Sequence, residues 1–290
     1  MISKSTILHL RLPFFLFLLP VFLFALAISG NWQNQKTILV FFILHFLLYP
    51  ASNSFNSYYD RDENSIGLLE KPPAVKKELL WVSLSLDALA VLLSIFIGWR
   101  FALAVFIYGM ASKLYSHPRF RLKKRPIASL LWVGIGQGFC VFITVCQAVT
   151  KIPFHTLLLN PEVLCAGLLG AAYLIGAYPM TQIYQHEEDK RHGDMTMSRL
   201  LGIRGTFIFT AIVYFLAAVG FILFFLLRSE GLKSLLYILF QIPPVLYFLV
   251  WLVKTFQDEK KADYRHAMQL NFLSSISLNV FFGILCFWRC

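Results

Sequence analysis

The apolar segments of this chain constrain its fold more than any other feature. A helix needs about 20 apolar residues to cross the roughly 30 Å hydrocarbon core of a bilayer, and segments of about that length recur along the whole sequence. With 58% hydrophobic residues and a mean hydropathy of +0.67, the chain is predicted to be an all-α integral membrane protein, a bundle of nine transmembrane helices. The fourth segment is short and has Lys113 near its end. The nine segments are 12–30, 37–59, 79–99, 101–116, 126–150, 162–184, 205–227, 234–253 and 267–288.

The loops between these segments are too short for a separate soluble domain, so residues 1–290 are predicted to form a single membrane domain. The five cysteines fall in or at the ends of apolar segments and form no CxxC pair, which argues against a zinc site or structural disulfides. The first apolar segment lacks a convincing small-residue cleavage site. We therefore expect it to be retained as a helix rather than removed as a signal peptide.

The net charge of +11 could indicate nucleic-acid binding, but its distribution indicates membrane topology instead. With nine spans, the N-terminus and the loops after even-numbered spans share one side. That side holds 20 of the 26 lysines and arginines, and the other side holds 6. Because positive charge accumulates in cytoplasmic loops, we predict a cytoplasmic N-terminus, an external C-terminus, a bacterial inner membrane as the location, and no nucleic-acid partner.

Two acidic clusters lie where apolar segments end on this cytoplasmic side. The first, NSYYDRDEN at 56–64, follows the second segment, and the second, QHEEDKRHGD at 185–194, follows the sixth. Oxygen ligands from two helix ends at the same depth can bracket Mg²⁺, which proteins usually hold with a few carboxylates and substrate phosphates. The side chains whose spacing of four residues places them on one helix face are Asn56, Asp60 and Asn64 in the first cluster, and Gln185 and Asp189 in the second.

Basic residues near these clusters fit the same interpretation. Lys71 and Lys77 follow the first cluster, and Arg121 and Lys123 lie between the fourth and fifth segments. Such side chains could bind phosphate oxygens directly. The alternative is that the cytoplasmic loops are basic only to fix topology and to contact anionic lipid. Topology does not require acidic clusters on the basic side, so they are the stronger indication of a site.

These residues resemble the UbiA superfamily of intramembrane prenyltransferases. Its members have nine transmembrane helices and two acidic motifs, roughly NxxxDxxxD after helix two and DxxxD after helix six. Asn56, Asp60 and Asn64 match the first motif except at its last position, and Gln185 and Asp189 match the second except at its first. Three further stretches are similar to family segments: Gly193, Thr196, Leu201 and Gly202 after the second motif, Lys71 to Lys77, which looks like an RPxPSGR loop, and YSHPRFRLK at 115–123, which looks like YSxPPxRLK.

The resemblance implies an Mg²⁺-dependent enzyme that transfers a prenyl group from an isoprenoid diphosphate to a hydrophobic acceptor, commonly an aromatic ring or a quinone precursor. The diphosphate would be bound at the cytoplasmic mouth of the bundle, with the prenyl tail in an apolar tunnel open toward membrane lipid. The implied catalytic residues are Asp60 and Asp189. The implied metal ligands are Asn56, Asp60, Asn64, Gln185 and Asp189, with Asp62 and Glu188 as further candidates. The implied diphosphate ligands are Lys71, Lys77, Tyr115, Arg121 and Lys123, with Lys190 and Arg191 as further candidates.

The departures from the family pattern leave alternatives open. Asn64 and Gln185 stand where the family has acids, so each motif has lost one formal charge. Asp62, Glu63, Glu187 or Glu188 could compensate if the helix ends turn; otherwise one metal binds weakly or the site uses a single ion. The activity could also be terpene cyclisation, or the chain could be a non-catalytic member that binds an isoprenoid or quinone. The acceptor, the prenyl chain length and the oligomeric state are left open.

Three ionisable residues outside the motif positions carry their own expectations. Asp87 lies inside the third apolar segment, where a carboxylate is costly, and we expect it to be hydrogen-bonded or protonated in a structural role. His186 and His192 flank Asp189 and could contact phosphate. Their spacing suggests no three-ligand group, so the sequence does not predict metal binding by them.

The glycines of GIGQG in the fifth segment, Gly134, Gly136 and Gly138, follow no strand and so do not form a dinucleotide-binding loop. Small residues at such spacing allow close approach of membrane helices. We predict close helix packing at this point.

Overall fold

The computed structural model describes residues 2–30, 33 and 35–288, which form helices and connecting loops with no β-strand. The α-helices are α1 (Lys4–His9), α2 (Phe15–Ser29), α3 (Lys36–Phe42), α4 (Tyr49–Asp60), α5 (Glu78–Ser94), α6 (Trp99–Ser116), α7 (Pro126–Val133), α8 (Val141–Thr150), α9 (Phe154–Leu159), α10 (Pro161–Ala177), α11 (His186–Arg191), α12 (Met197–Leu227), α13 (Gly231–Gln257) and α14 (Tyr264–Phe287). Shorter segments are the 3₁₀ helices η1 (Leu12–Phe14), η3 (Leu122–Lys124), η5 (Tyr178–Thr181) and η6 (Glu259–Lys261), and the π-helical η2 (Ile43–Leu48) and η4 (Gly134–Cys140).

Seven helical segments of the described chain are long and apolar enough to cross a membrane, which makes this an integral membrane protein of the predicted all-α class. They coincide with seven of the nine predicted spans, and they are Lys4–Ser29, Lys36–Asp60, Pro126–Thr150, Pro161–Thr181, Met197–Leu227, Gly231–Gln257 and Tyr264–Phe287. The other two predicted spans form α5 and α6, of 17 and 18 residues. At 1.5 Å per residue these helices are about 26 Å long, and both carry charged side chains. The count of nine spans therefore stays a prediction.

The charges in α5 and α6 pair with each other. The ammonium of Lys113 on α6 contacts the carboxylate of Asp87 on α5, and the two side chains are 14% and 16% exposed. A partly buried carboxylate is tolerated when a cation and its hydrogen bond accompany it. Asp87 is therefore paired with a cation within the bundle, and its structural role stays a prediction.

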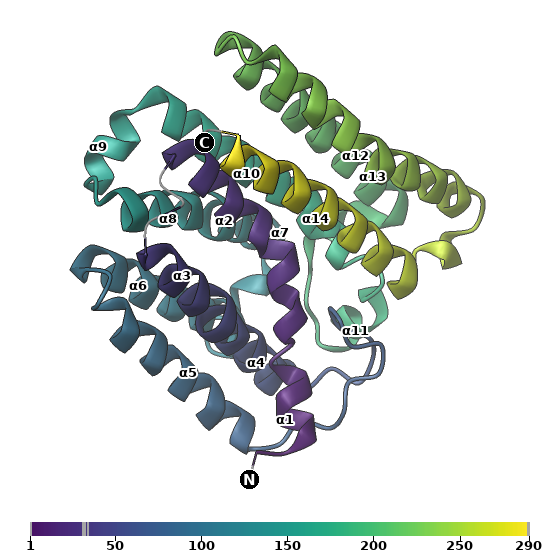
Figure 1. Cartoon of the computed structure of the whole chain (residues 1–290). Helices are drawn as coiled ribbons and strands as arrows, with labels where there is room; N and C mark the ends of the chain where they lie inside the picture. The colour runs from purple at the N-terminus through teal and green to yellow at the C-terminus, as the bar shows by residue number, and fades with distance from the viewer. Residues whose placement is uncertain (1, 31–32, 34, 289–290) are drawn as a thin grey trace.

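The long helices follow one another around a ring (Figure 1). Starting from α2, each helix packs against the next in the order α14, α13, α12, α10, the α7–η4–α8 unit, α6, α5 and α4, and the η2 end of α4 returns to α2. In Figure 1 the α12–α13 pair lies on one flank, and α3 to α6 lie on the opposite one. The two acidic clusters lie at the end of α4 and in the α11 segment that follows α10, and they meet where the Glu188 carboxylate accepts a hydrogen bond from the Glu63 backbone N–H.

Helix α12 is interrupted near its start. Gly202 has φ 70° and ψ 173°, a conformation that L side chains rarely adopt, and Ser198 Oγ lies 2.9 Å from Thr206 Oγ1 across the break. The interruption separates residues 197–201 from the remainder of α12, which begins close to the start of the predicted span at 205.

The GIGQG segment packs against α10 as predicted. A Cβ atom on Gly138 would lie 2.6 Å from the Cα of Ala171, and one on Gly134 would lie 2.3 Å from Cγ1 of Ile175. A Cβ on Gly136 would meet nothing within 4 Å. Two of the three glycines therefore serve the helix contact.

Replacing Gly138 by alanine is expected to lower the melting temperature of the purified protein in detergent micelles. The added methyl group would press on the α10 backbone, and overpacking of this kind costs about 1–3 kcal/mol. Gly136→Ala is the matched control in the same helix, and it should leave the melting temperature unchanged or raise it, since alanine favours helix over glycine. Equal melting temperatures for the two variants would contradict this account of the packing.

Candidate active site

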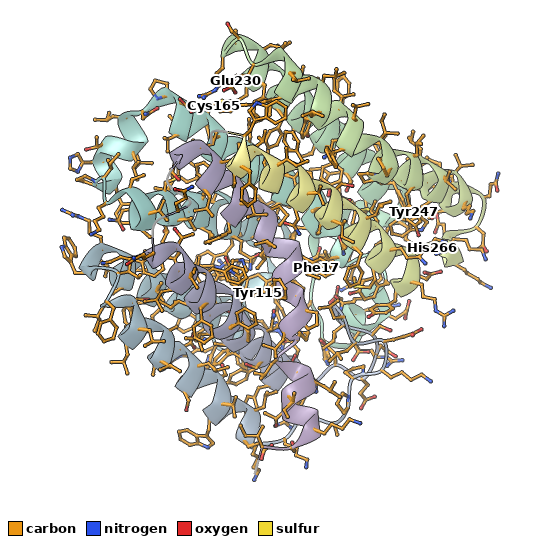
Figure 2. All side chains as sticks on the ribbon, in the orientation of Figure 1. Phe17, Tyr115, Cys165, Glu230, Tyr247 and His266 are labelled. Carbon is orange, nitrogen blue, oxygen red and sulfur yellow. The ribbon has the colours of Figure 1, made fainter. Side chains whose placement is uncertain are left out.

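A cavity of about 840 Å³ lies within the ring of helices. Most of its wall is apolar and includes Phe17, Leu44, Val105, Phe139, Ile143 and Phe154. Phe17 and Tyr115, both cavity-lining, are labelled near the centre of the bundle in Figure 2. Polar side chains gather where α4, α6, η3 and α11 meet. At that end the cavity is lined by Asn56, Asp60, Asp62, Lys123, Gln185, Glu188 and Asp189.

The first acidic cluster reaches the cavity from the end of α4. Asn56 Nδ2 donates to Asp60 Oδ2 at 2.7 Å and to Ser116 Oγ at 3.2 Å, so the two side chains share one helix face as predicted. The helix stops at Asp60, because Arg61 adopts a left-handed conformation with φ 51°. Asn64 therefore leaves the helix face that its spacing predicted.

The second cluster begins before α11 and continues into it. Gln185 is the N-cap residue of α11, and its amide donates to Ser65 O at 3.1 Å, while Asp189 inside α11 accepts a hydrogen bond from Thr196 Oγ1 at 2.9 Å. Gln185 thus contacts the loop after α4, and both it and Asp189 line the cavity.

Glu188 joins the two clusters directly. Its carboxylate accepts hydrogen bonds from the Asn64 side chain and from the Glu63 backbone N–H, the latter at 3.3 Å. Glu188 is only 5% exposed. A carboxylate of the second cluster therefore lies beside the Asn64 side chain.

Lys123 and Arg121 lie between the acids. Lys123 Nζ is 2.7 Å from Asp60 Oδ1 and 3.0 Å from Asp194 Oδ2, and Arg121 Nη2 is 2.9 Å from Asp194 Oδ2. Burial favours the neutral form of Lys123, but the carboxylates of Asp60 and Asp194 outweigh it and hold the pKa of this ammonium above its ordinary value. Lys123 therefore stays charged, and both basic side chains face the acidic clusters.

Two residues were missed as site residues by sequence reasoning. Asp194 is fully buried and contacts Arg121, Lys123 and Lys124; its position next to Gly193 within the second cluster was the available signal. Arg11 lines the cavity, is 8% exposed, and donates from Nη2 to Asn53 O at 3.0 Å, while its Nε has no hydrogen-bond partner. In the sequence it looked like a topology charge before an apolar segment.

The other predicted diphosphate ligands lie in different places. Tyr115 lines the cavity, and its hydroxyl is hydrogen-bonded to that of Tyr178. Arg191 contacts Glu188 at 3.5 Å from the exposed side. Lys71, Lys77 and Lys190 are exposed and are not among the residues that line the cavity.

Burial disfavours the ionised forms of Asp189 and Asp62 at the polar end of the cavity. Burial, with Asp194 and Asp62 nearby, raises the pKa of Asp189 to about 7, and burial, with Asp60 nearby, raises the pKa of Asp62 to about 6. A divalent cation would stabilise the ionised forms of both groups. The oxygen donors of Asp60, Asp62, Glu188 and Asp189, all facing one cavity, fit a hard cation of this kind.

Comparison with known proteins decides the family, because residues 17–276 match the model of the UbiA prenyltransferase family. The chain belongs to the UbiA prenyltransferase family. The resemblance to this family, which the sequence motifs predicted, is thereby confirmed over residues 17–276, and so is the prediction of a prenyltransferase. This UbiA prenyltransferase is also 24% identical over 271 residues to digeranylgeranylglyceryl phosphate synthase from Thermococcus kodakarensis, a match that covers 91% of this chain and 88% of that protein.

Solved structures show the same fold. A UbiA homologue from Aeropyrum pernix K1, without ligand, has a TM-score of 0.70 at 16% identity, covering 93% of this chain and 96% of that one. A UbiA homologue from Archaeoglobus fulgidus bound to DMAPP and Mg²⁺ has a TM-score of 0.67 at 15% identity, covering 98% of this chain and 99% of that one. The architecture of this UbiA prenyltransferase is therefore that of its family.

Proposed function

We propose that this prenyltransferase moves a prenyl group from an isoprenoid diphosphate to a lipid-soluble acceptor, with the diphosphate bound at the polar end of the cavity and the prenyl chain in its apolar part. The observation that carries the proposal is the placement of buried carboxylates and a buried ammonium at one end of an otherwise apolar cavity of about 840 Å³. Such a cavity matches a molecule with a strongly charged head and a hydrocarbon tail.

Mg²⁺ is the cofactor we assign to this end, held by Asp60 and Asp189 together with Asn56, Asp62 and Glu188. When bound, it neutralises charge on the diphosphate, which makes the diphosphate a better leaving group. A homologue's structure with DMAPP and Mg²⁺ supports the assignment. Asn64 and Gln185, whose amides are engaged with Glu188 and Ser65, would act by orienting the loops rather than as ligands.

The basic residues bind the donor in this proposal. Lys123 and Arg121, which pair with Asp60 and Asp194 in this structure, would donate some of their hydrogen bonds to diphosphate oxygens. Asp194 would keep both side chains in place. Arg11, a buried cation among the cavity-lining residues, would provide a further donor.

The acceptor enters from the bilayer in this proposal. Ile107 on α6, Leu131 on α7 and Ile135 on η4 line the cavity and are 56%, 45% and 48% exposed. An apolar wall that reaches the outer surface supports an acceptor dissolved in lipid, such as a quinone precursor or another aromatic compound. The relation to a synthase of digeranylgeranylglyceryl phosphate makes a prenylated glyceryl phosphate the other class to assay.

The test is release of diphosphate and capture of product by the purified chain. Dimethylallyl, geranyl, farnesyl and geranylgeranyl diphosphates are each supplied with Mg²⁺ or with a chelator, alongside aromatic, quinone-precursor and glyceryl phosphate acceptors. Mg²⁺-dependent release with a prenylated acceptor as the product is the expected result. Cyclic hydrocarbon products would replace the proposal with terpene cyclisation, and absence of turnover with every pair, together with tight binding of an isoprenoid, would replace it with a binding role.

We further propose that all nine helical segments span the membrane as one UbiA-like domain, with the N-terminus and the polar end of the cavity in the cytoplasm of a bacterium. The split of 20 to 6 in lysine and arginine supports this orientation. The polar end is built from segments 56–64, 115–124 and 185–196, all on the side that carries the excess charge.

Labelling of single cysteines should report this orientation. In a cysteine-free background, Arg119→Cys and Lys190→Cys are expected to react only with a membrane-permeant thiol reagent in intact cells. Lys151→Cys, an exposed position on the opposite side, is the matched control and should also react with an impermeant reagent. Rapid labelling of Arg119→Cys and Lys190→Cys by the impermeant reagent would reverse the orientation.

A further inference from the structure

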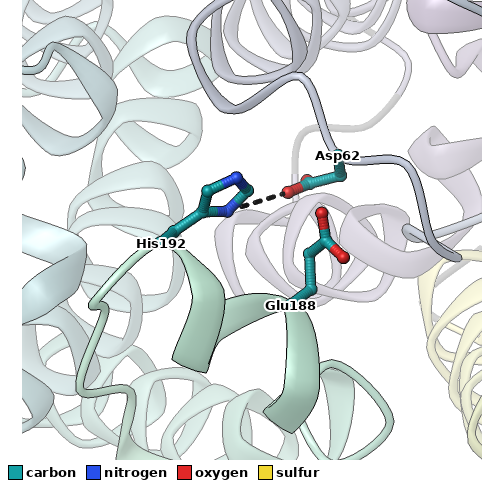
Figure 3. Close-up of side chains that lie close together, drawn as sticks. All are labelled: Asp62, Glu188 and His192. Atoms are coloured by element: carbon teal, nitrogen blue, oxygen red, sulfur yellow. Dashed lines mark ion pairs between the residues drawn. The ribbon is translucent and has the colours of Figure 1, made fainter.

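Three possible metal ligands that do not belong to the matched motif positions lie together at the polar end of the cavity. One ligand atom each of Asp62, Glu188 and His192 can be chosen so that all three lie within 4.8 Å of one another. Figure 3 shows the three side chains converging from two segments, Asp62 from the loop after α4, and Glu188 and His192 from α11 and its end. His192 Nδ1 is 3.7 Å from Asp62 Oδ1.

Local structure explains why spacing in the sequence did not reveal this group. The left-handed residue Arg61 ends α4 and turns Asp62 away from the helix face. Glu188 and His192 are four residues apart, so they lie on the same side of α11. The backbone N–H of His192 donates to the backbone carbonyl of Glu188 at 3.1 Å. The third ligand thus comes from a segment more than 120 residues away, which no spacing rule can anticipate.

The neighbours of the group leave it open to a cation. Asn64 and the Glu63 N–H hold Glu188 in place, and Arg191, 64% exposed, contacts Glu188 Oε2 at 3.5 Å from the solvent side. Asp62 and Glu188 both line the cavity beside Asp60 and Asp189. The ligand atoms of this three-residue group therefore lie close to one another, and its two carboxylates border the proposed diphosphate site.

The chemistry of this donor set differs from that of the motif residues. Mg²⁺ strongly prefers oxygen ligands, whereas an imidazole nitrogen together with carboxylates suits first-row transition-metal ions. We propose that Asp62, Glu188 and His192 form a cation site, and that its histidine makes the site bind Mn²⁺ more tightly than Mg²⁺. The inference deepens the proposed function, because the site borders the same cavity, and it names a metal preference for it.

Binding of Mn²⁺ to the substrate-free full-length chain tests the inference. The protein is purified in detergent micelles, its affinity tag is removed because a polyhistidine tag would bind the ion, and it is stripped of metal. Pulsed electron paramagnetic resonance of bound Mn²⁺ is expected to show modulation from a ¹⁴N nucleus. His192→Asn should abolish this modulation and weaken Mn²⁺ binding at least about tenfold, the loss that even outer-shell changes cause at metal sites, while calorimetry finds a smaller change for Mg²⁺.

Controls separate this result from general damage. His155→Asn alters an exposed histidine on α9 and should keep the nitrogen signal and the Mn²⁺ affinity of the wild type. Asp62→Asn should weaken the binding of both Mn²⁺ and Mg²⁺, since it removes a carboxylate ligand. Melting temperatures report whether each variant is folded. A wild-type spectrum without ¹⁴N modulation, or a folded His192→Asn variant that keeps it, would overturn the inference.

The Mn²⁺-binding experiment and the diphosphate-release assay can fail independently of each other. Nitrogen-ligated Mn²⁺ in a protein that releases no diphosphate from any donor would keep the metal site and remove the proposed transfer activity. Turnover in a protein whose Mn²⁺ shows no nitrogen ligand would do the reverse.

Discussion

Replacing Asp60 or Asp189 by asparagine is expected to reduce diphosphate release from a prenyl diphosphate at least about 100-fold, an increase of about 2.7 kcal/mol in the activation barrier. Each substitution keeps the size of the side chain but removes one carboxylate charge from the end of the cavity where the cation is proposed to bind. Both residues line the cavity, and they approach it from different elements, α4 and α11. Rates are measured in detergent micelles at saturating Mg²⁺ and again over a Mg²⁺ titration.

The matched control for these variants is Glu259→Gln, which removes a 52%-exposed carboxylate paired with Arg204 on the surface. It should retain the wild-type rate. If Asp60→Asn and Asp189→Asn also retained it, the active site would lie elsewhere in the molecule.

Replacing Lys123 by methionine is expected to lower kcat/KM for the donor about 100-fold, with most of the change in KM, because the ammonium nearest to Asp60 is proposed to bind the diphosphate. The variant should also be less stable. Breaking a buried ion pair costs about 3–5 kcal/mol, and here it would leave Asp60 without its 2.7 Å contact. Steady-state kinetics with geranyl diphosphate and a thermal melt measure the two effects.

A second variant separates stability from substrate binding. Lys123→Met combined with Asp194→Asn removes one charge of each sign, so it should recover much of the melting temperature but none of the donor affinity. Recovery of near-normal kcat/KM in the double variant would make Lys123 a structural residue only. Lys123→Arg, which keeps the charge, is expected to fall between the wild type and Lys123→Met.

The parts of this molecule that sequence predicts well are those set by local periodicity. Seven of the long apolar runs form helical segments long and apolar enough to cross a membrane. Asn56 and Asp60, four residues apart, share a helix face with a 2.7 Å hydrogen bond between them. The family motifs likewise pointed to Asp189, Tyr115 and Lys123, which the fold brings to a single cavity.

The parts that sequence did not predict depend on contacts between distant segments. The pattern of Asn56, Asp60 and Asn64 assumed a continuous helix, but the chain turns at Arg61, where loop residues bond to Glu188 instead of continuing the helix. The grouping of Asp62 with His192 follows from that turn. Asp194 and Arg11 were overlooked because burial, not sequence pattern, makes their charges informative.

Ile107, Leu131 and Ile135 line the cavity and are exposed, and a substrate that follows the proposed route between them comes from the bilayer. Such a substrate is a solute of the bilayer, so its effective concentration is a mole fraction among lipids and not an amount per volume of water. Expanding the membrane at constant substrate content dilutes it, whereas expanding the aqueous phase does not. If the acceptor enters by this proposed route, we expect turnover to fall when the membrane grows at constant acceptor content.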